Sequence, residues 1–170
     1  MPKGRSIRPT ADRVREAIFN IIAPHVPDAR VLDLFAGTGA LGLEALSRGA
    51  SKAIFVDEQP QAVRLIHENV ELCGAQERVE VIRAAVHLAI RRLVDRGDSF
   101  HLIFMDPPYG KGYVEKTVLQ LDPLIYPETL VVAEHHLNDA LSSFIGAWTI
   151  WRERQYGDTK VSILMRDISC

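Results

Sequence analysis

The sequence predicts a doubly wound α/β fold, in which helices cover both faces of a mostly parallel sheet. Strand-like and helix-like segments alternate along most of the chain, which is typical of parallel sheets with crossover helices. A glycine-rich turn, Gly37-Thr38-Gly39, follows the first strand, as in many ligand-binding α/β domains. Two β-rich segments flank a Tyr156-Gly157-Asp158 turn, so the last strand is expected to be antiparallel and near an edge of the sheet.

Each element has a local signal. Thr10 can cap a first helix that runs to about Ile22, because apolar residues recur on one face of this segment. Strands are expected at residues 30–34, 53–56, 79–82, 100–105, 130–133, 148–154 and 160–165. Helices are expected at residues 40–47, 60–73, 86–95 and 113–121, with Pro60 in a first turn and glycines after the first three. Residues 100–105 are unusually apolar, which predicts a central strand that is buried on both faces.

Length and composition predict one soluble domain that spans residues 1–170. Hydrophobic residues make up 47% and charged residues 25% of the chain, which argues against a disordered or low-complexity protein. The longest apolar runs have only strand length, and the N-terminus has no apolar signal segment, so we expect a cytoplasmic protein. Cys73 and Cys170 lack metal-ligand spacing, and neither a metal nor a disulfide is expected.

Charge is unevenly distributed along the chain. The net charge is −2, but residues 1–20 contain five basic and only two acidic side chains. We therefore expect residues 1–23 to form a basic segment followed by a helix. Such a segment on an otherwise acidic body can contact phosphate groups, although a solvated terminus fits the same pattern.

The first candidate site combines an acid, a glycine turn and a second acid. Asp33 lies near the carboxyl end of the first strand, and Asp57 ends the second, where a carboxylate can accept both ribose hydroxyls of an adenosine ligand. The segment from Gly37 to Gly42 also matches the G-x-G-x-x-G dinucleotide fingerprint. Asp33 favours S-adenosylmethionine, because a carboxylate repels a pyrophosphate and attracts a sulfonium and an ammonium. A plain structural turn is the alternative.

The second candidate site is Asp106-Pro107-Pro108-Tyr109, directly after the apolar fourth strand. Two prolines fix φ and hold the carbonyls of Asp106 and Pro107 in a rigid frame. An exocyclic amine on a base is a poor nucleophile, and two acceptors can hold its N–H bonds so that the lone pair faces a methyl donor. Tyr109 offers a face for stacking an extruded base, worth about 1–3 kcal/mol. The alternative is a strand-ending turn whose tyrosine packs on the core.

These motifs resemble a known family. Asp-Pro-Pro-Tyr and the segment from Asp33 to Gly39 are similar to class I methyltransferases that modify exocyclic amines. Residues 7–20, with Arg-Pro-Thr followed by Asp-Arg-Val-Arg-Glu, and Tyr156-Gly157-Asp158-Thr159 resemble the RsmD family of bacterial ribosomal RNA guanine-N2 methyltransferases. The resemblance covers nearly the whole chain. It implies a Rossmann-like, seven-stranded fold, S-adenosyl-L-methionine as cofactor, a monomer, and a guanine N2 target in ribosomal RNA or a small-subunit ribosomal particle.

Matching positions assign residues to three roles. The resemblance implies that the cofactor-binding residues are Asp33, Phe35, Ala36, Gly37, Gly39, Asp57, Glu58, Ala84 and Ala85. It implies that the catalytic residues are Asp106, Pro107, Pro108 and Tyr109. It implies that the RNA-contacting residues are Arg8, Thr10, Arg13, Arg15, Lys111 and Tyr156. Two positions depart from the family: alanine replaces a common aspartate after the third strand, and only nine residues precede Thr10, where a basic hairpin is expected.

Three other functions remain compatible with parts of the sequence. An adenine-N6 nucleic-acid methyltransferase also uses Asp-Pro-Pro-Tyr. An NAD-dependent oxidoreductase uses the glycine turn but leaves Asp-Pro-Pro-Tyr unexplained. A non-catalytic RNA-binding domain fits Ala85 and the short N-terminal segment. Four histidines without ligand spacing are expected to be structural or surface residues: His87, His101, His135 and His136.

Overall fold

In the residues that the structure describes, eight strands form one sheet in the order β3-β2-β1-β4-β5-β8-β7-β6. The computed structural model describes the backbone of residues 2–110 and 112–167, and their side chains from residue 11 onward. The strands are β1 (Arg30–Leu34), β2 (Lys52–Asp57), β3 (Val79–Arg83), β4 (Phe100–Met105), β5 (Ile125–His136), β6 (Phe144–Ile145), β7 (Trp148–Tyr156) and β8 (Thr159–Arg166). The first five run parallel, as expected for crossover connections.

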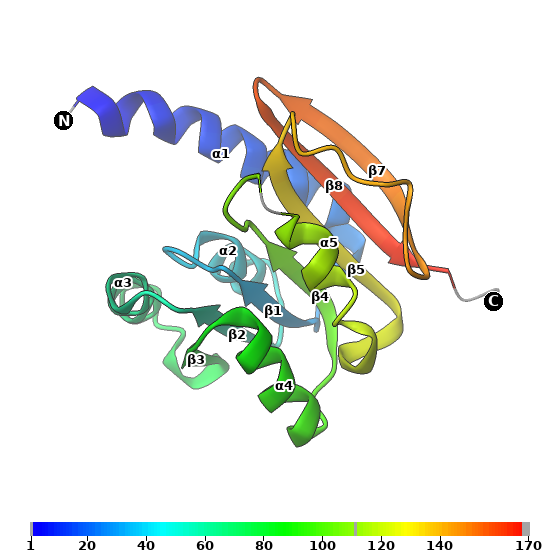
Figure 1. The fold of residues 1–170 in the computed structure, drawn as a ribbon. Helices are drawn as coiled ribbons and strands as arrows, with labels where there is room; N and C mark the ends of the chain where they lie inside the picture. Colours follow the sequence, from blue (N-terminus) through cyan, green and yellow to red (C-terminus); the bar gives the residue numbers. More distant parts are fainter. Residues whose placement is uncertain (1, 111, 168–170) are drawn as a thin grey trace.

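Helices cover both faces of this sheet (Figure 1). They are α1 (Pro2–Ile22), α2 (Ala40–Ser47), α3 (Pro60–Leu72), α4 (Val86–Arg96) and α5 (Tyr113–Val118), with 3₁₀ turns at Ala23–His25, Gln76–Arg78 and Asp122–Leu124. Apolar side chains of α1, α2 and α3 pack on one face of the sheet, and those of α4 and α5 pack on the other. This confirms the doubly wound α/β class. No helix in the described part of the chain is both long and apolar enough to cross a membrane.

The order of the strands reverses between β1 and β4. From β1 the chain first builds outward to β2 and β3, and then returns to place β4 on the other side of β1. Crossover loops on either side of such a reversal leave the sheet in opposite directions, which opens a crevice at the carboxyl ends of the strands. Phe35 follows β1 and Asp106 follows β4, so the two predicted motifs meet at this reversal.

The C-terminal hairpin extends the sheet beyond β5, with its last strand on the inner side. β8 pairs antiparallel with both β5 and β7, so it lies between two strands that precede it in the sequence. The antiparallel last strand is therefore confirmed. The expected count of seven strands is too low, because the two-residue strand β6 pairs with Trp148 and Thr149 of β7 at the edge.

The first helix is longer than its sequence signal predicts. α1 begins at Pro2, so Thr10 lies inside the helix and the predicted helix start at Thr10 is wrong. Threonine in a helix interior costs only a fraction of a kcal/mol relative to alanine, so a local cap signal does not force a helix to begin there. The second half of α1 is anchored by Ile18, Phe19 and Ile22, which are all buried against the sheet.

Candidate active site

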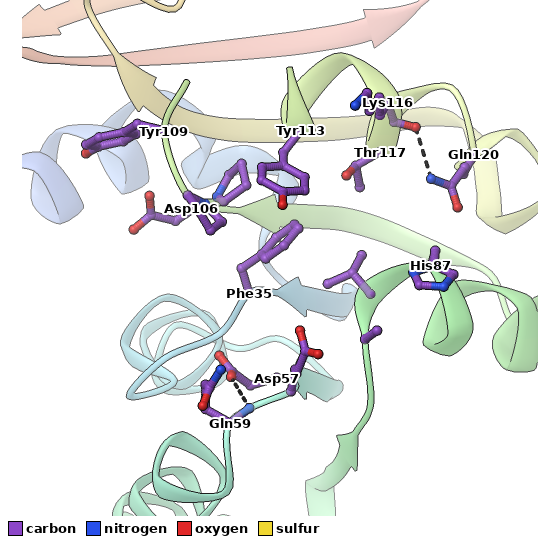
Figure 2. Close-up of a pocket in the computed structure, with 15 residues that line it drawn as sticks. Phe35, Asp57, Gln59, His87, Asp106, Tyr109, Tyr113, Lys116, Thr117 and Gln120 are labelled. Carbon is purple, nitrogen blue, oxygen red and sulfur yellow. Dashed lines mark hydrogen bonds between the residues drawn. The ribbon is translucent and has the colours of Figure 1, made fainter. Parts of the chain in front are cut away.

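A cavity of about 820 Å³ opens at the carboxyl ends of β1, β2 and β4. Its volume lies in the range of small-molecule sites. Figure 2 shows Asp57 on one side of the cavity, Asp106 and Tyr109 on the other, and Phe35 between them. The residues that line it are Phe35, Asp57, Glu58, Gln59, Ala85, Val86, His87, Asp106, Pro107, Pro108, Tyr109, Tyr113, Lys116, Thr117 and Gln120. The acid of β2 and the Asp-Pro-Pro-Tyr motif thus share one cleft.

Asp57 faces the cavity and closes the glycine turn. Its Oδ2 accepts a hydrogen bond from the backbone N–H of Gly37 at 2.9 Å, and its Oδ1 accepts one from the N–H of Gln59 at 2.9 Å. A carboxylate has about four lone-pair sites, so both oxygens retain acceptor capacity for a ligand hydroxyl. The Gly37 N–H, which in a dinucleotide site would point at a phosphate, is already paired with a carboxylate.

Asp33 lies behind the cavity instead of in its lining. The side chain is only 3% exposed, and its Oδ2 accepts a hydrogen bond from the backbone N–H of Gly42 at 3.0 Å. Burial, opposed by this hydrogen bond and reinforced by the charges of Asp106 and Asp57, raises the pKa of Asp33 to about 8. The structure therefore does not support the sequence argument that a charged Asp33 at the turn selects the ligand; Asp57 holds that position.

Gly42 shows why the third glycine of the turn is needed. A Cβ at this position would overlap the ring of Phe55 on β2 and would lie 3.2 Å from the Asp33 carboxylate. The glycine therefore lets α2 approach the sheet closely enough for its N–H to reach Asp33. The fingerprint spacing thus has a packing function here, independent of any dinucleotide.

The Asp-Pro-Pro-Tyr loop presents one acid and one aromatic ring to the cavity. Asp106 is exposed and lines the cavity, and desolvation by the protein around its carboxyl raises its pKa. Tyr109 is half exposed, with its ring 5.3 Å from that of His136 at the end of β5. Burial is the main reason that the pKa of Tyr109 is raised. The tyrosine thus packs against the end of β5 while its ring stays half exposed.

Several cavity residues escaped sequence reasoning. Helix α5 lies beside the cavity, and its Tyr113 ring lies 6.3 Å from the ring of Phe35 (Figure 2). Phe35 itself has a φ of 54°, a left-handed conformation that is uncommon for a bulky residue and is often found at functional sites. Lys116, Thr117 and Gln120 complete this wall. In the sequence these residues belong to a predicted helix that carries no motif, so nothing there marked them as part of a site.

The remaining predicted residues fall into three groups. Glu58 and Ala85 line the cavity, whereas Ala36, Gly37, Gly39 and Ala84 lie outside its lining. Arg13 is exposed on α1, Arg15 pairs with Asp12 at 2.9 Å and Glu44 at 3.5 Å, and Tyr156 packs against the core under α1. Lys111 and the side chains of Arg8 and Thr10 lie outside the described residues.

The histidines have identifiable structural partners. His101 accepts a hydrogen bond from the Arg30 N–H at 2.9 Å, and buried His135 bonds the hydroxyl of Ser162 at 2.8 Å. His87 lines the cavity, which its sequence context did not indicate. Within residues 2–110 and 112–167, no cluster of three or more His, Cys, Asp or Glu side chains is arranged to hold a metal ion.

Comparison with known proteins identifies relatives along the whole chain. The sequence model of the family described as conserved hypothetical protein 95 matches residues 1–165. Ribosomal RNA small subunit methyltransferase D of Escherichia coli K12 is 34% identical over 170 residues, which is 98% of this chain and 83% of that protein. A solved structure of a conserved hypothetical protein from Streptococcus pyogenes is 36% identical, with a TM-score of 0.83 over 89% of this chain and 94% of that one.

More distant structures share the fold alone. The SAM-dependent methyltransferase of Agrobacterium tumefaciens is 19% identical, with a TM-score of 0.70 over 94% of this chain and 62% of that one. The fold is therefore that of class I methyltransferases, as the sequence motifs indicated. Together with the family model and the close relatives, this shows that the chain belongs to the RsmD family, whose sequence model is described as conserved hypothetical protein 95.

Proposed function

We propose that the protein is an S-adenosylmethionine-dependent methyltransferase that methylates the exocyclic N2 amine of a guanine in small-subunit ribosomal RNA. The observation that carries this proposal is the shared cavity, which places the β2 carboxylate of Asp57 opposite the rigid Asp-Pro-Pro-Tyr loop. The relatives support the substrate class, since the E. coli protein is named a ribosomal RNA small subunit methyltransferase. Guanine N2 is the target that the RsmD resemblance implies.

The cavity suits this cofactor better than a dinucleotide. Asp57 retains acceptor sites for the ribose hydroxyls, with Glu58 beside it, and the Ala85–Val86 segment supplies an apolar edge for adenine. The Asp57 carboxylate occupies the Gly37 N–H and places negative charge at the turn, which disfavours a pyrophosphate there. The turn itself is shaped by residues outside the cavity lining: Asp33, Ala36, Gly37 and Gly39. The cofactor supplies a methyl group already activated on a sulfonium.

The protein's own contribution is to hold and orient the amine. The Asp106 carboxylate and a carbonyl of the proline pair accept its two N–H bonds, which directs the lone pair toward the methyl group. Tyr109 offers a half-exposed ring for the extruded base, and Phe35 and Tyr113 enclose the space beside it. The rate gain comes mainly from positioning two bound reactants in a partly desolvated cleft.

Replacing Asp106 tests this function. We expect Asp106→Ala to lower kcat for methyl incorporation into undermethylated small-subunit RNA by about 100-fold or more, because the amine loses its charged acceptor. Binding of S-adenosylhomocysteine, measured by calorimetry, should change little. Asp95→Ala, at an exposed position of α4, is the matched control. Near-wild-type turnover in a folded Asp106→Ala protein would overturn the assignment.

The product identifies the target base. Nucleosides from methylated RNA are separated and weighed by mass spectrometry, with free ribosomal RNA and small-subunit particles as parallel substrates. N2-methylguanosine supports the proposal, whereas N6-methyladenosine would replace it with the adenine enzyme. Sedimentation of the purified protein checks the further expectation that it acts as a monomer.

A further inference from the structure

A second carboxyl group lies directly behind Asp106. Glu134 is on β5, which pairs in parallel with β4 so that Met105 is opposite Ala133. The next residues along the two strands, Asp106 and Glu134, are therefore neighbours at the carboxyl ends, and their side chains are hydrogen-bonded to each other. Glu134 is partly buried and does not line the cavity, so it acts on the site from behind the Asp-Pro-Pro-Tyr loop.

The pair shares one proton. Burial first, and then the negative charge and the hydrogen bond of Asp106, raise the pKa of Glu134 to about 8. The charge of Asp33 on β1 raises the pKa of Glu134 by a smaller amount. Glu134 in turn raises the pKa of Tyr109. The residue opposite Glu134 on β8 is the apolar Val161. The hydrogen bond raises the pKa of Glu134 and opposes the rise at Asp106, so Glu134 is the donor of the pair and the Asp106 carboxylate is the acceptor.

We propose that Glu134 is a positioning residue for methyl transfer: its hydrogen bond fixes one oxygen of Asp106 and leaves the other directed at the cavity for the substrate amine. This inference rests on the proposed function. Without Glu134, the Asp106 side chain can rotate between several positions, and misplacement of a catalytic group by about 1 Å can cost about 100-fold in rate. An ionised Glu134 would repel Asp106 instead of holding it.

Two substitutions separate positioning from structure. Glu134→Gln keeps a donor of similar shape that does not titrate, and Glu134→Ala removes the donor. Glu128→Gln, at an exposed position of the same strand, is the matched control. Steady-state kcat and KM are measured for RNA and for S-adenosylmethionine from pH 6.5 to 9.5, and S-adenosylhomocysteine binding is measured by calorimetry.

We expect wild-type kcat to fall as pH rises through about 8, the pKa of Glu134, because the hydrogen bond is lost when its donor ionises. Glu134→Gln should keep kcat within about threefold at pH 7 and lose this fall, whereas the Glu128→Gln profile should match the wild type. Glu134→Ala should lower kcat by about 10- to 100-fold, with KM for S-adenosylmethionine and S-adenosylhomocysteine affinity little changed.

The inference is overturned if Glu134→Gln shows the same alkaline fall as the wild type, or if folded Glu134→Ala keeps wild-type kcat. The glutamine profile decides the question even where the alanine variant does not fold. A wild-type protein without methyl transfer would instead overturn the proposed function. An active wild type with unaffected Glu134 variants overturns the positioning role alone.

Discussion

Asp33 and Asp57 are both acids near the ends of neighbouring strands, yet the structure gives them opposite surroundings. Both acids lie on the same face of the sheet, because Asp33 is opposite Phe55 and Asp57 follows Phe55 by two residues. Asp33 lies within its strand under α2, where it bonds Gly42, whereas Asp57 ends its strand and faces the cavity. One carboxyl is therefore a buried packing partner and the other a ligand-facing acceptor. The sequence identified both as acids at the site, but their different roles depend on how far each lies from the carboxyl end of its strand and on what packs over it.

The buried state of Asp33 predicts a pH-dependent stability change in Asp33→Asn. The pKa of Asp33 is about 8 in the folded protein, against 3.8 for an aspartate side chain in water. The folded state therefore holds the proton more tightly, and this group's stabilising effect is lost as pH rises from about 4 to 8, by at most about 1.4 kcal/mol per pH unit. Asparagine keeps an acceptor for Gly42 and does not titrate.

Urea unfolding at pH 5 and pH 7 measures this effect. The free energy of unfolding of Asp33→Asn, relative to wild type, should be higher at pH 7 than at pH 5 by about 1–3 kcal/mol. Asp95→Asn on the surface of α4 serves as the control and should show no such change. If the free energy of unfolding of Asp33→Asn differs from that of the wild type by the same amount at both pH values, Asp33 is not buried in its protonated form.

At the scale of elements, predictions succeeded where a local pattern and the tertiary environment agree. β1, α2 and β4 have the predicted bounds, because apolar runs bounded by glycine and polar residues fit buried parallel strands and their crossover. β5 extends beyond its apolar stretch at both ends, since it pairs with β8 as far as His136 and with Phe100 of β4 at Ile125. The site was predicted in part, because acids and prolines at strand ends are visible as motifs. Tyr113 and Glu134 were missed because their roles depend on which segments pack together.

Phe19 is one of the buried residues that anchor helix α1 to the sheet. The ring is fully buried, 5.7 Å from Phe104 of β4, and the guanidinium of Arg48 lies 5.0 Å above it. Phe19→Ala should lower the free energy of unfolding by about 3–5 kcal/mol in chemical denaturation. Asn20→Ala, the exposed neighbour on the same helix, should change it by less than about 0.5 kcal/mol. Similar losses for the two variants would show that α1 is not part of the cooperative core.

At the scale of the whole molecule, the net charge determines how strongly the protein as a whole attracts RNA phosphates. A net charge of −2 gives no general attraction to phosphate, and the predicted RNA contacts include basic groups on α1. Figure 1 shows the N-terminal half of α1 projecting beyond the sheet. Arg13 is exposed on this helix, whereas Arg15 is already paired with Asp12 and Glu44.

These two arginines therefore make a matched pair of substitutions. If Arg13 contacts a phosphate, Arg13→Ala should weaken RNA binding for all sequences and reduce the slope of log affinity against log salt by about 1. Arg15→Ala should have a smaller effect, because its charge is partly neutralised within the protein. Binding is measured by fluorescence anisotropy between 50 and 300 mM salt. Equal slopes for the wild type and Arg13→Ala would exclude the contact.

The insertion of β8 between β5 and β7 has a consequence for synthesis. Translation releases β5 from the ribosome well before β8, since residue 159 follows the end of β5 at residue 136. Until then, the apolar stretch of β5 has one unpaired edge, and such an edge is a template for association with other nascent chains. Premature termination between these strands would leave that edge of β5 permanently unpaired. Pairing with β8 therefore protects the chain from aggregation at this edge.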